Sequence, residues 1–196
     1  LDAPAWAAAI PARVEYTLRE GAARPELSTA VRALWSERYL YLGYECPYTE
    51  LTVFEPPLRN GERFDLGKAG VSLWDRDVVE AFIGADAENI RRYAEFIVAP
   101  TNERLDLVIL GFPERDFAWQ SGFQSAVKVD AAAKVWTCEL RIPLEALSSA
   151  APAAGTRWRL NLFRNDRAHG AFLAWNPTLQ GTAHVAEKFG VLEFAD

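Results

Sequence analysis

Two glutamates interrupt apolar, strand-like runs. Glu80 lies between Val78 and Phe82, two positions from each, and Glu95 has the same kind of place inside Tyr93–Val98. Because side chains alternate along a strand, each carboxylate points to the same side as its apolar neighbours. A carboxylate there either pairs with an arginine or accepts hydrogen bonds from a ligand. If the two strands are adjacent, the pair also has the separation of about 5–10 Å that glycoside hydrolysis requires.

Seven tryptophans supply the second chemical feature. Trp74 and Trp175 each precede turn-forming residues, where an indole ring is able to present one face to a ligand; packing into the core is the alternative for both. Trp35, Trp136 and Trp158 have apolar neighbours two positions away. We therefore expect these three in the core.

Histidines and aspartates are the candidate metal ligands. His169 and His184 lie in or beside a stretch without charged residues and form a candidate pair for a metal or haem; solvation or hydrogen bonding is the alternative. Asp75, Asp77 and Asp86 are candidate oxygen ligands for calcium. No DxDxDG run accompanies them, so turn capping is the competing role.

Other catalytic signatures are missing from the sequence. It contains no glycine-rich phosphate loop, no GxSxG, no HExxH and no CxxC. Alternation places Cys46 and Cys138 on apolar strand faces, so both are expected to be small buried hydrophobic residues. A disulfide between them requires their strands to be neighbours.

Length and charge narrow the function classes. A chain of 196 residues predicts one domain over residues 1–196, large enough to fold without disulfides or metal. The net charge is −6 and the basic residues are scattered, which argues against nucleic-acid binding. The uncharged span Ala168–Ala186 contains glycines, a proline, an asparagine and a glutamine, so we expect no transmembrane helix.

The elements that must position these residues follow a period of two. About ten short strands are predicted, with turn signals every 8–12 residues, at Ala30–Trp35, Tyr39–Cys46, Val78–Ile83, Tyr93–Val98, Leu105–Leu110, Gln124–Val129, Val135–Ile142, Arg157–Arg164, Ala171–Trp175 and Val191–Phe194. This pattern predicts an all-β, antiparallel β-sandwich of jelly-roll type. Helix is confined to single turns at Pro4–Ile10 and Leu144–Leu147. The polar loop Asn60–Gly70 is expected to lie over the surface that Trp74 lines.

The ordered set of motifs resembles the family 9 carbohydrate-binding modules and their DOMON-type relatives. The resemblance covers nearly the whole chain and rests on the order of the motifs. They are an N-terminal tryptophan, the hairpin Thr29–Tyr41, LWDRDVVEAFI at Leu73–Ile83, YAEFIVAPTNE at Tyr93–Glu103, WTCELRIPL at Trp136–Leu144, WRLNLFR at Trp158–Arg164, then Trp175 and HVAEKFGVL at His184–Leu192.

The resemblance implies a non-catalytic sandwich that binds xylan or cellulose, often at a reducing end. In such modules two tryptophans clamp one sugar ring, and the matching positions are Trp74 and Trp175. Glu80 matches the glutamate that contacts sugar hydroxyls. The family's arginine on the following strand has no counterpart, because Tyr93-Ala94-Glu95 occupies that region. We include Glu95 among the expected sugar contacts. The family's asparagine is replaced by Phe172.

Arg164 and Asn165 are the expected substitutes for the family's missing polar contacts. The resemblance also implies structural calcium, with no other cofactor required, and a secreted, periplasmic or cell-surface location. The chain is expected to stand alone or to be part of a larger glycan-degrading protein.

Three other functions compete with sugar binding. DOMON-type sandwiches also bind haem, for which this chain offers only His169 and His184. A glycoside hydrolase would use Glu80 as a catalytic acid. A domain retained for protein contacts would instead keep Trp74 and Trp175 in its core.

Overall fold

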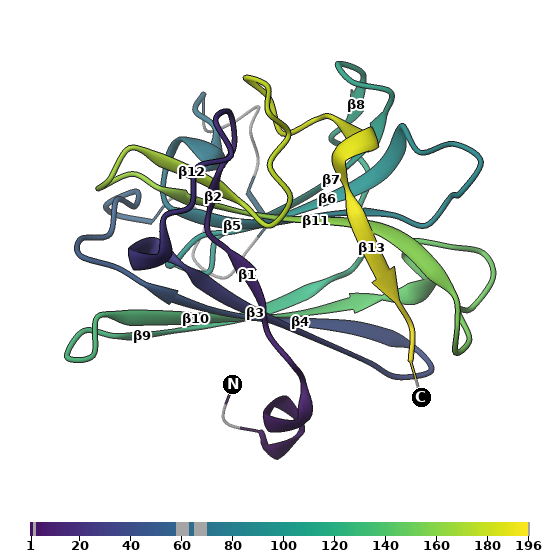
Figure 1. Cartoon of the computed structure of the whole chain (residues 1–196), viewed down its shortest axis with the longest axis horizontal. Coiled ribbons are helices and arrows are strands. Elements are labelled where there is room, and N and C mark those ends of the chain that lie inside the picture. The colour runs from purple at the N-terminus through teal and green to yellow at the C-terminus, as the bar shows by residue number, and fades with distance from the viewer. Residues whose placement is uncertain (2, 58–62, 65–69, 196) are drawn as a thin grey trace.

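The fold follows from apolar residues that alternate along short strands. The computed structural model describes residues 1, 3–57, 63–64 and 70–195. Thirteen strands of this described part form two antiparallel sheets that stack as two layers (Figure 1). The predicted antiparallel β-sandwich is therefore confirmed. Most of the predicted loop Asn60–Gly70 lies outside the described residues.

The lower layer in Figure 1 is a five-stranded sheet. Its strands lie in the order β1, β3, β4, β10 and β9, with bounds Ala12–Val14, Thr29–Trp35, Tyr39–Pro47, Val135–Pro143 and Gln124–Asp130. The upper layer is an eight-stranded sheet in which β13 pairs with β11 beside the main path. The main path runs β2, β12, β11, β5, β6, β7 and β8, with bounds Tyr16–Thr17, Ala171–Ala174, Arg157–Asp166, Val78–Gly84, Arg92–Val98, Arg104–Leu110 and Arg115–Asp116; β13 spans Gly190–Glu193.

Three strands are not predicted from the sequence, because they are too short to show the alternation of apolar and polar residues. β1, β2 and β8 contain three, two and two residues, whereas alternation becomes visible over about four. Helix is limited in the described residues to short 3-10 turns, which include the two predicted ones. The turns are η1 Pro4–Ala8, η2 Pro25–Leu27, η3 Leu73–Asp75, η4 Leu144–Ala146 and η5 Ala186–Lys188. None of the described helices has the length and apolar character needed to cross a membrane.

The main core lies between the two sheets. Along β5, Val79, Ala81 and Ile83 face inward and join Trp136 of β10 and Trp158 of β11 in one buried cluster. The predicted core positions of these two tryptophans are thereby confirmed. Trp35 is half-buried and packs against the same cluster.

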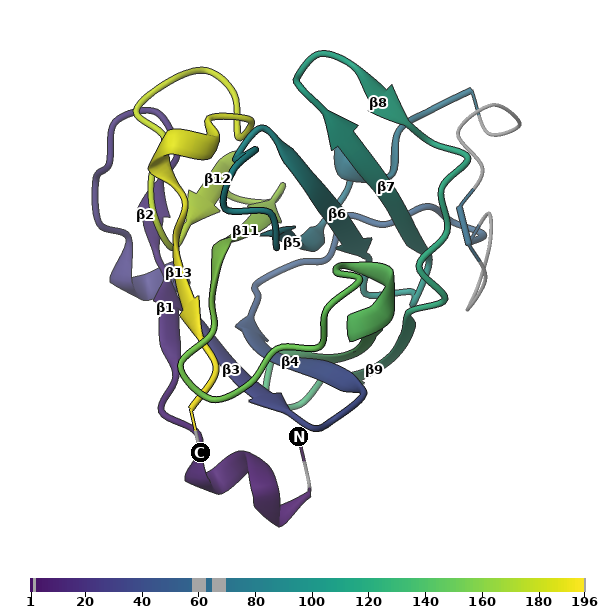
Figure 2. The ribbon, with the colours of Figure 1, turned by 90° about the vertical axis from the view of Figure 1, so that its right-hand side faces the viewer.

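A second apolar cluster covers the opposite, outer face of the eight-stranded sheet. Val78 and Phe82 of β5 face this side and pack with Leu73 of η3 and with Phe189, which follows η5. In Figure 1 the segment leading to β13 and the hairpin that carries β8 rise on this side, and Figure 2 shows β6, β7 and β8 side by side. Because both faces of the sheet are covered, every residue of β5 is buried.

Cys46 and Cys138 are both buried free thiols on the inner faces of adjacent strands. The register of β4 and β10 places Cys138 opposite Tyr44 and Cys46 opposite Trp136, so the two cysteines are diagonal neighbours. Burial raises the pKa of Cys46 to about 12 and that of Cys138 well above its ordinary value. The predicted role of small buried hydrophobic residues is confirmed.

We expect neither thiol to react in the native protein, because the reactive thiolate is buried and disfavoured. A colorimetric thiol reagent at mildly alkaline pH should report almost no thiol before denaturation and both thiols after it. Rapid reaction of one cysteine in the folded state would contradict this arrangement.

Candidate functional site

The outer face of the eight-stranded sheet carries a pocket of about 390 Å³. Its walls come from η3, from strands β5, β6, β7, β8, β11 and β12, and from the loops after β11 and before η5. Trp74, Phe82 and Phe172 provide its aromatic surface, and Glu80, Glu95, Arg115, Asn165, Arg167, Thr182 and His184 provide its polar groups. A pocket of this size with convergent polar groups in an apolar lining is typical of a small-molecule site.

Glu80 and Glu95 come together at the base of this pocket. They lie on the adjacent strands β5 and β6, where Glu80 pairs with Ile97 and Phe82 pairs with Glu95. The two carboxylates are therefore diagonal neighbours on one face, and each is 4% exposed. The structure thus brings together the two acids that the sequence placed on apolar strand faces.

Burial raises the pKa of both acids. The pKa of Glu80 rises to about 7, against smaller lowering effects of Arg167 and of a hydrogen bond from Asn165. The pKa of Glu95 rises well above its ordinary value because of burial first and the negative charge of Glu80 second, and Arg115 opposes the rise. The pair therefore holds protons at a pH where exposed glutamates are ionised.

The protein satisfies these carboxylates only in part. The side-chain amide of Asn165 donates to Oε1 of Glu80 at 3.3 Å, and Oε2 of Glu95 is buried without a hydrogen-bond partner among the described residues. Within that part of the chain neither acid forms an ion pair with Arg115 or Arg167. Each acid is therefore influenced by an arginine that it does not contact.

Arg115 lies against the aromatic wall of the pocket. Its guanidinium carbon is 5.9 Å from the ring centre of Trp74 and 4.9 Å from that of Phe112. One guanidinium nitrogen lies 3.5 Å from Nε2 of His184. The Arg115 guanidinium is thus held over aromatic rings by cation–π contacts, and part of its hydrogen-bond donor capacity stays unused.

His184 is neutral and fixed between rings. It stacks between Phe82 and Phe112, with ring centres 5.1 and 4.2 Å away, and its Nδ1 lies 2.8 Å from the hydroxyl oxygen of Tyr93. Burial and then Arg115 lower its pKa to about 4. Since Nε2 faces a guanidinium donor, we infer that Nδ1 carries the hydrogen and donates to Tyr93.

Trp74 and Asn165, two of the predicted sugar contacts, both line this pocket. Trp74 lines the pocket, and the amide of Asn165 reaches both its carbonyl oxygen, at 3.4 Å, and Glu80. Arg167 also donates to the carbonyl oxygen of Trp74. The backbone N–H of Arg167 in turn donates to Asp77 at 2.7 Å, so Asp77 fixes the position of the loop that follows β11.

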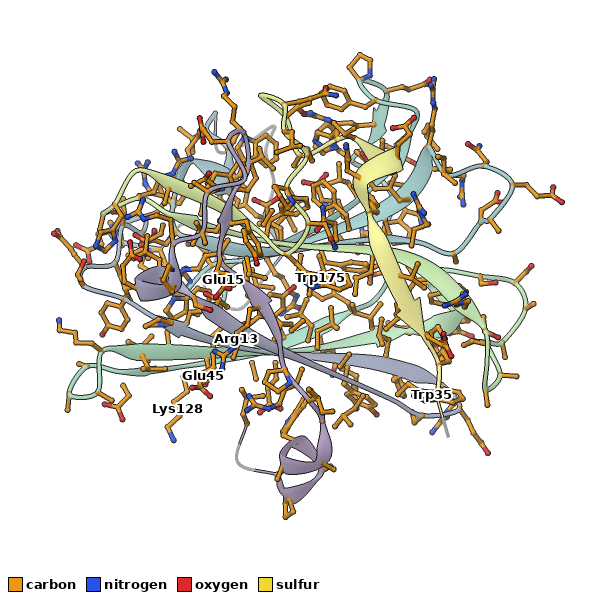
Figure 3. The ribbon with its side chains drawn as sticks, viewed as in Figure 1. Arg13, Glu15, Trp35, Glu45, Lys128 and Trp175 are labelled. Carbon is orange, nitrogen blue, oxygen red and sulfur yellow. The ribbon has the colours of Figure 1, made fainter. Side chains whose placement is uncertain are left out.

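Trp175 lies on the other side of the sheet, which corrects the expectation of a clamp with Trp74. Ala171 and Leu173 of β12 face the inner core, and Trp175, two positions further, packs against that same core. Its indole rests on Gly190, where a Cβ would lie 2.7 Å from the ring. Figure 3 places its label between the two sheets.

Arg164 also faces inward, which corrects its expected role as a sugar contact. The guanidinium is 1% exposed and donates to the Thr29 hydroxyl at 3.0 Å and to Asp166 at 2.9 Å. Asn165, the next residue along β11, points to the opposite face and reaches the pocket. Of these two candidate substitutes, the structure brings only Asn165 to Glu80.

The metal candidates have protein partners instead of one another. Asp77 accepts hydrogen bonds from the backbone of Thr52 and Arg167, Asp86 caps the turn that follows it, and Asp75 forms a capping box with Ser72. Across the described residues no three His, Cys, Asp or Glu side chains gather as a metal site. These aspartates therefore form no cluster of three carboxylates among the described residues, and structural calcium stays a prediction.

The two histidines proposed as haem ligands are likewise engaged separately. Nδ1 of His169 lies 2.9 Å from Asp166, whereas His184 is held by Tyr93, Arg115 and two phenylalanine rings. Among the described residues, no hydrogen bond or ring contact joins His169 to His184. The geometry gives no support to a paired haem site.

Several pocket residues were not predicted from the sequence. Arg115 and Arg167 of the pocket lie in or beside turns, as does Phe112 next to Arg115, and alternation gives no direction for side chains there. The sequence marks His184 as a metal or haem ligand or as a solvated or hydrogen-bonded side chain, and Phe172 as the replacement for an asparagine, so neither is predicted to line this pocket. A charged residue in an otherwise apolar segment was the useful signal, and it identified only Glu80 and Glu95.

The raised pKa values predict a pH-dependent stability for the Glu95→Gln variant. A carboxyl whose pKa is higher in the folded state stabilises the fold below its unfolded pKa, and this contribution is lost as the pH rises through the folded value. Glutamine cannot ionise, so the variant should have a higher Tm than wild type at about pH 8 and the same Tm near pH 4. A gain of about 1 kcal/mol corresponds to about 2–4 °C for a chain of this size.

The matched control for this measurement is Glu193→Gln. Glu193 is exposed on β13 and pairs with Arg157, so its substitution should not produce the pH-dependent gain. Thermal melts of the three proteins at both pH values decide the matter. A difference in Tm between Glu95→Gln and wild type that is equal at both pH values contradicts the burial of an ionisable carboxyl pair.

Several proteins are similar to this chain at low sequence identity. An extracellular protein of Arthroderma benhamiae is 23% identical over 188 residues, which cover 87% of this chain and 80% of that protein. A candidate carbohydrate-binding protein from Bacteroides uniformis has a TM-score of 0.72 at 16% identity, covering 95% of this chain and 86% of that one.

A family 9 carbohydrate-binding module from Caldicellulosiruptor kristjanssonii is also similar, in two sugar complexes. With cellotriose its TM-score is 0.71 at 15% identity, covering 100% of this chain and 87% of the module; with glucose the values are 0.66, 15%, 98% and 87%. The model of the family described as carbohydrate family 9 binding domain-like matches residues 2–196. The chain therefore belongs to this family of non-catalytic carbohydrate-binding modules.

Proposed function

We propose that the pocket on the outer face binds one end of a neutral oligosaccharide of the xylan or cellulose type. The observation that carries this proposal is the separation of Glu80 and Glu95 from Arg167 and Arg115. A sugar hydroxyl donates one hydrogen bond and accepts others, so it is able to bridge a carboxylate and a guanidinium that do not touch. A ligand with several neighbouring hydroxyls is able to bridge Glu80 to Arg167 and Glu95 to Arg115 at the same time.

The aromatic lining supports the same class of ligand. A pyranose ring has a face of C–H groups that packs on an indole, and such ring packing adds about 0.5–1.5 kcal/mol beyond the buried area. Trp74 is the indole available in this pocket, with Phe82 and Phe172 beside it. Trp74 with the half-buried Phe172 takes the place of the expected pair of tryptophans, whereas Phe82 is 1% exposed and packs against His184.

The comparisons support a choice of sugars to test and a location outside the cell. The structurally similar module from Caldicellulosiruptor kristjanssonii was solved with cellotriose and with glucose, so glucose-based sugars are the first ligands to test. The relative from Arthroderma benhamiae is described as extracellular, which supports a location outside the cell for this chain. We also propose that the chain supports glycan degradation as part of a larger protein.

Trp74→Ala should abolish sugar binding without unfolding the protein, since Trp74 is only partly buried. Trp175→Ala should instead lower the stability of the fold and leave sugar binding intact. It removes a side chain from the inner core, so we expect a loss of up to about 3 kcal/mol of stability with binding retained. Calorimetric titration with cellobiose and thermal melts measure the two effects. Loss of sugar binding in a folded Trp175→Ala variant would support a clamp of Trp74 and Trp175 and contradict the proposed site.

The preference for a chain end is tested with reduced sugars. Cellobiose and xylobiose are titrated beside their borohydride-reduced alditols, in which the terminal ring is opened. If the pocket holds a reducing-end ring, the alditols should bind at least about tenfold more weakly, a difference of about 1.4 kcal/mol. Equal affinity for a disaccharide and its alditol contradicts the reducing-end part of the proposal.

A further inference from the structure

The two acids at the base of the pocket form an unusual pair. Glu80 and Glu95 are diagonal neighbours on adjacent strands, each 4% exposed, and their carboxylates face the same pocket. Two like charges this close and this far from water strongly disfavour the doubly ionised state. Without a ligand, the pair therefore favours keeping one proton up to about neutral pH.

The other charged and titratable groups around the pair do not take this proton. Arg167, from the loop after β11, donates to the carbonyl oxygen of Trp74 and lies 4.0 Å from Asp75. Arg115, from β8, lies 3.5 Å from His184 and over two aromatic rings. Both arginines are permanently charged.

The remaining titratable groups are two neutral rings. Burial lowers the pKa of His184 to about 4, so this side chain is neutral at physiological pH. Tyr93, on β6, stays protonated because burial and the nearby Glu95 raise its pKa. The two glutamates are consequently the groups of this pocket that exchange a proton near neutral pH.

Glu95 has an unused acceptor that points to a ligand. Its Oε2 is buried and has no hydrogen-bond partner among the described residues. A buried carboxylate oxygen without a donor is costly, and a hydroxyl supplied by a ligand removes that cost. Hydrogen bonds to an ionised carboxylate are roughly twice as strong as those to a neutral one. A bound sugar therefore favours the ionised form of Glu95.

We propose that a sugar entering this pocket displaces a proton from the Glu80–Glu95 pair, so that Glu95 links binding to pH. This inference rests on the proposed sugar-binding function of the same pocket. The proton passes from the carboxyl group to water, and hydroxyl hydrogens of the sugar then donate to the resulting carboxylate. No bond of the sugar breaks.

The expected sign is tighter binding at higher pH. Release of one full proton changes the affinity about tenfold per pH unit, and release of half a proton about threefold. We therefore expect the Kd for cellobiose to fall by about threefold to tenfold for each pH unit near neutrality. At higher pH, where the empty pocket has already lost the proton, the dependence should level off.

The experiment is calorimetric titration of the full chain with cellobiose near pH 7 in phosphate and in imidazole buffer. The two buffers have different heats of ionisation, so the difference between the measured heats counts the protons released. Wild type should release about half to one proton per sugar. Glu95→Gln should bind more weakly and release almost none. Glu193→Gln, on exposed β13, is the matched control and should release as many protons as wild type.

A second measurement needs no ligand. Carbon-13 NMR of the glutamate carboxyl carbons in the free protein should show two groups that titrate above the usual range, and Glu80→Gln should shift the titration of Glu95 downward. If all glutamates titrate at ordinary values, the inference is overturned whether or not sugars bind.

The outcomes separate this inference from the function on which it rests. Sugar binding with equal heats in both buffers overturns the proton release and leaves the binding function in place. Proton release that persists in Glu95→Gln overturns the role of Glu95. Failure of every tested sugar to bind the folded protein overturns the proposed function and the linked proton release together.

Discussion

The eight-stranded sheet is buried on both faces, and this determines what each polar side chain on it must do. Its inner face packs on the five-stranded sheet, and its outer face is covered by segments such as those around Leu73 and Phe189. A carboxylate on β5 or β6 is therefore withdrawn from water by the fold itself. Such a group costs free energy unless hydrogen bonds replace those lost to water. Asn165 supplies only one weak replacement, and the remaining need is open to a ligand.

The walls of the pocket are held by hydrogen bonds that converge on one backbone carbonyl. Both Asn165 and Arg167 reach the carbonyl oxygen of Trp74, and Asn165 also reaches Glu80. Asp77 holds the backbone of Arg167. The indole that would stack on a sugar and the acid that would accept its hydroxyls are thus positioned by the same groups. This coupling between loop and strand keeps the two halves of the site in one fixed relation.

Alternation within a strand predicted much more of this molecule than relations between strands did. The ten expected strands and the common face of Glu80 and its apolar neighbours follow from local sequence. Arg164 lies an even number of positions from Trp158, so alternation alone places both on one face, whereas the face that Trp175 takes depends on pairing between segments far apart in the chain. Arg164 pairs with Val79, an inward residue, and with Leu173, so both Arg164 and Trp175 face inward. A register of this kind is not written in either strand alone.

The chain uses an arginine and a carboxylate in two opposite ways. On the inner face Arg164 and Asp166 are in direct contact at 2.9 Å and almost fully buried, and Arg164 also donates to Thr29, although its Nε has no partner among the described residues. On the outer face Glu95 and Arg115 influence each other without contact. In a contacting buried pair each charge already has its partner within the protein, which leaves little for a ligand. A separated pair contributes less to the fold, but it keeps a donor and an acceptor aimed into one space, which is the arrangement that recognition of a hydroxyl requires.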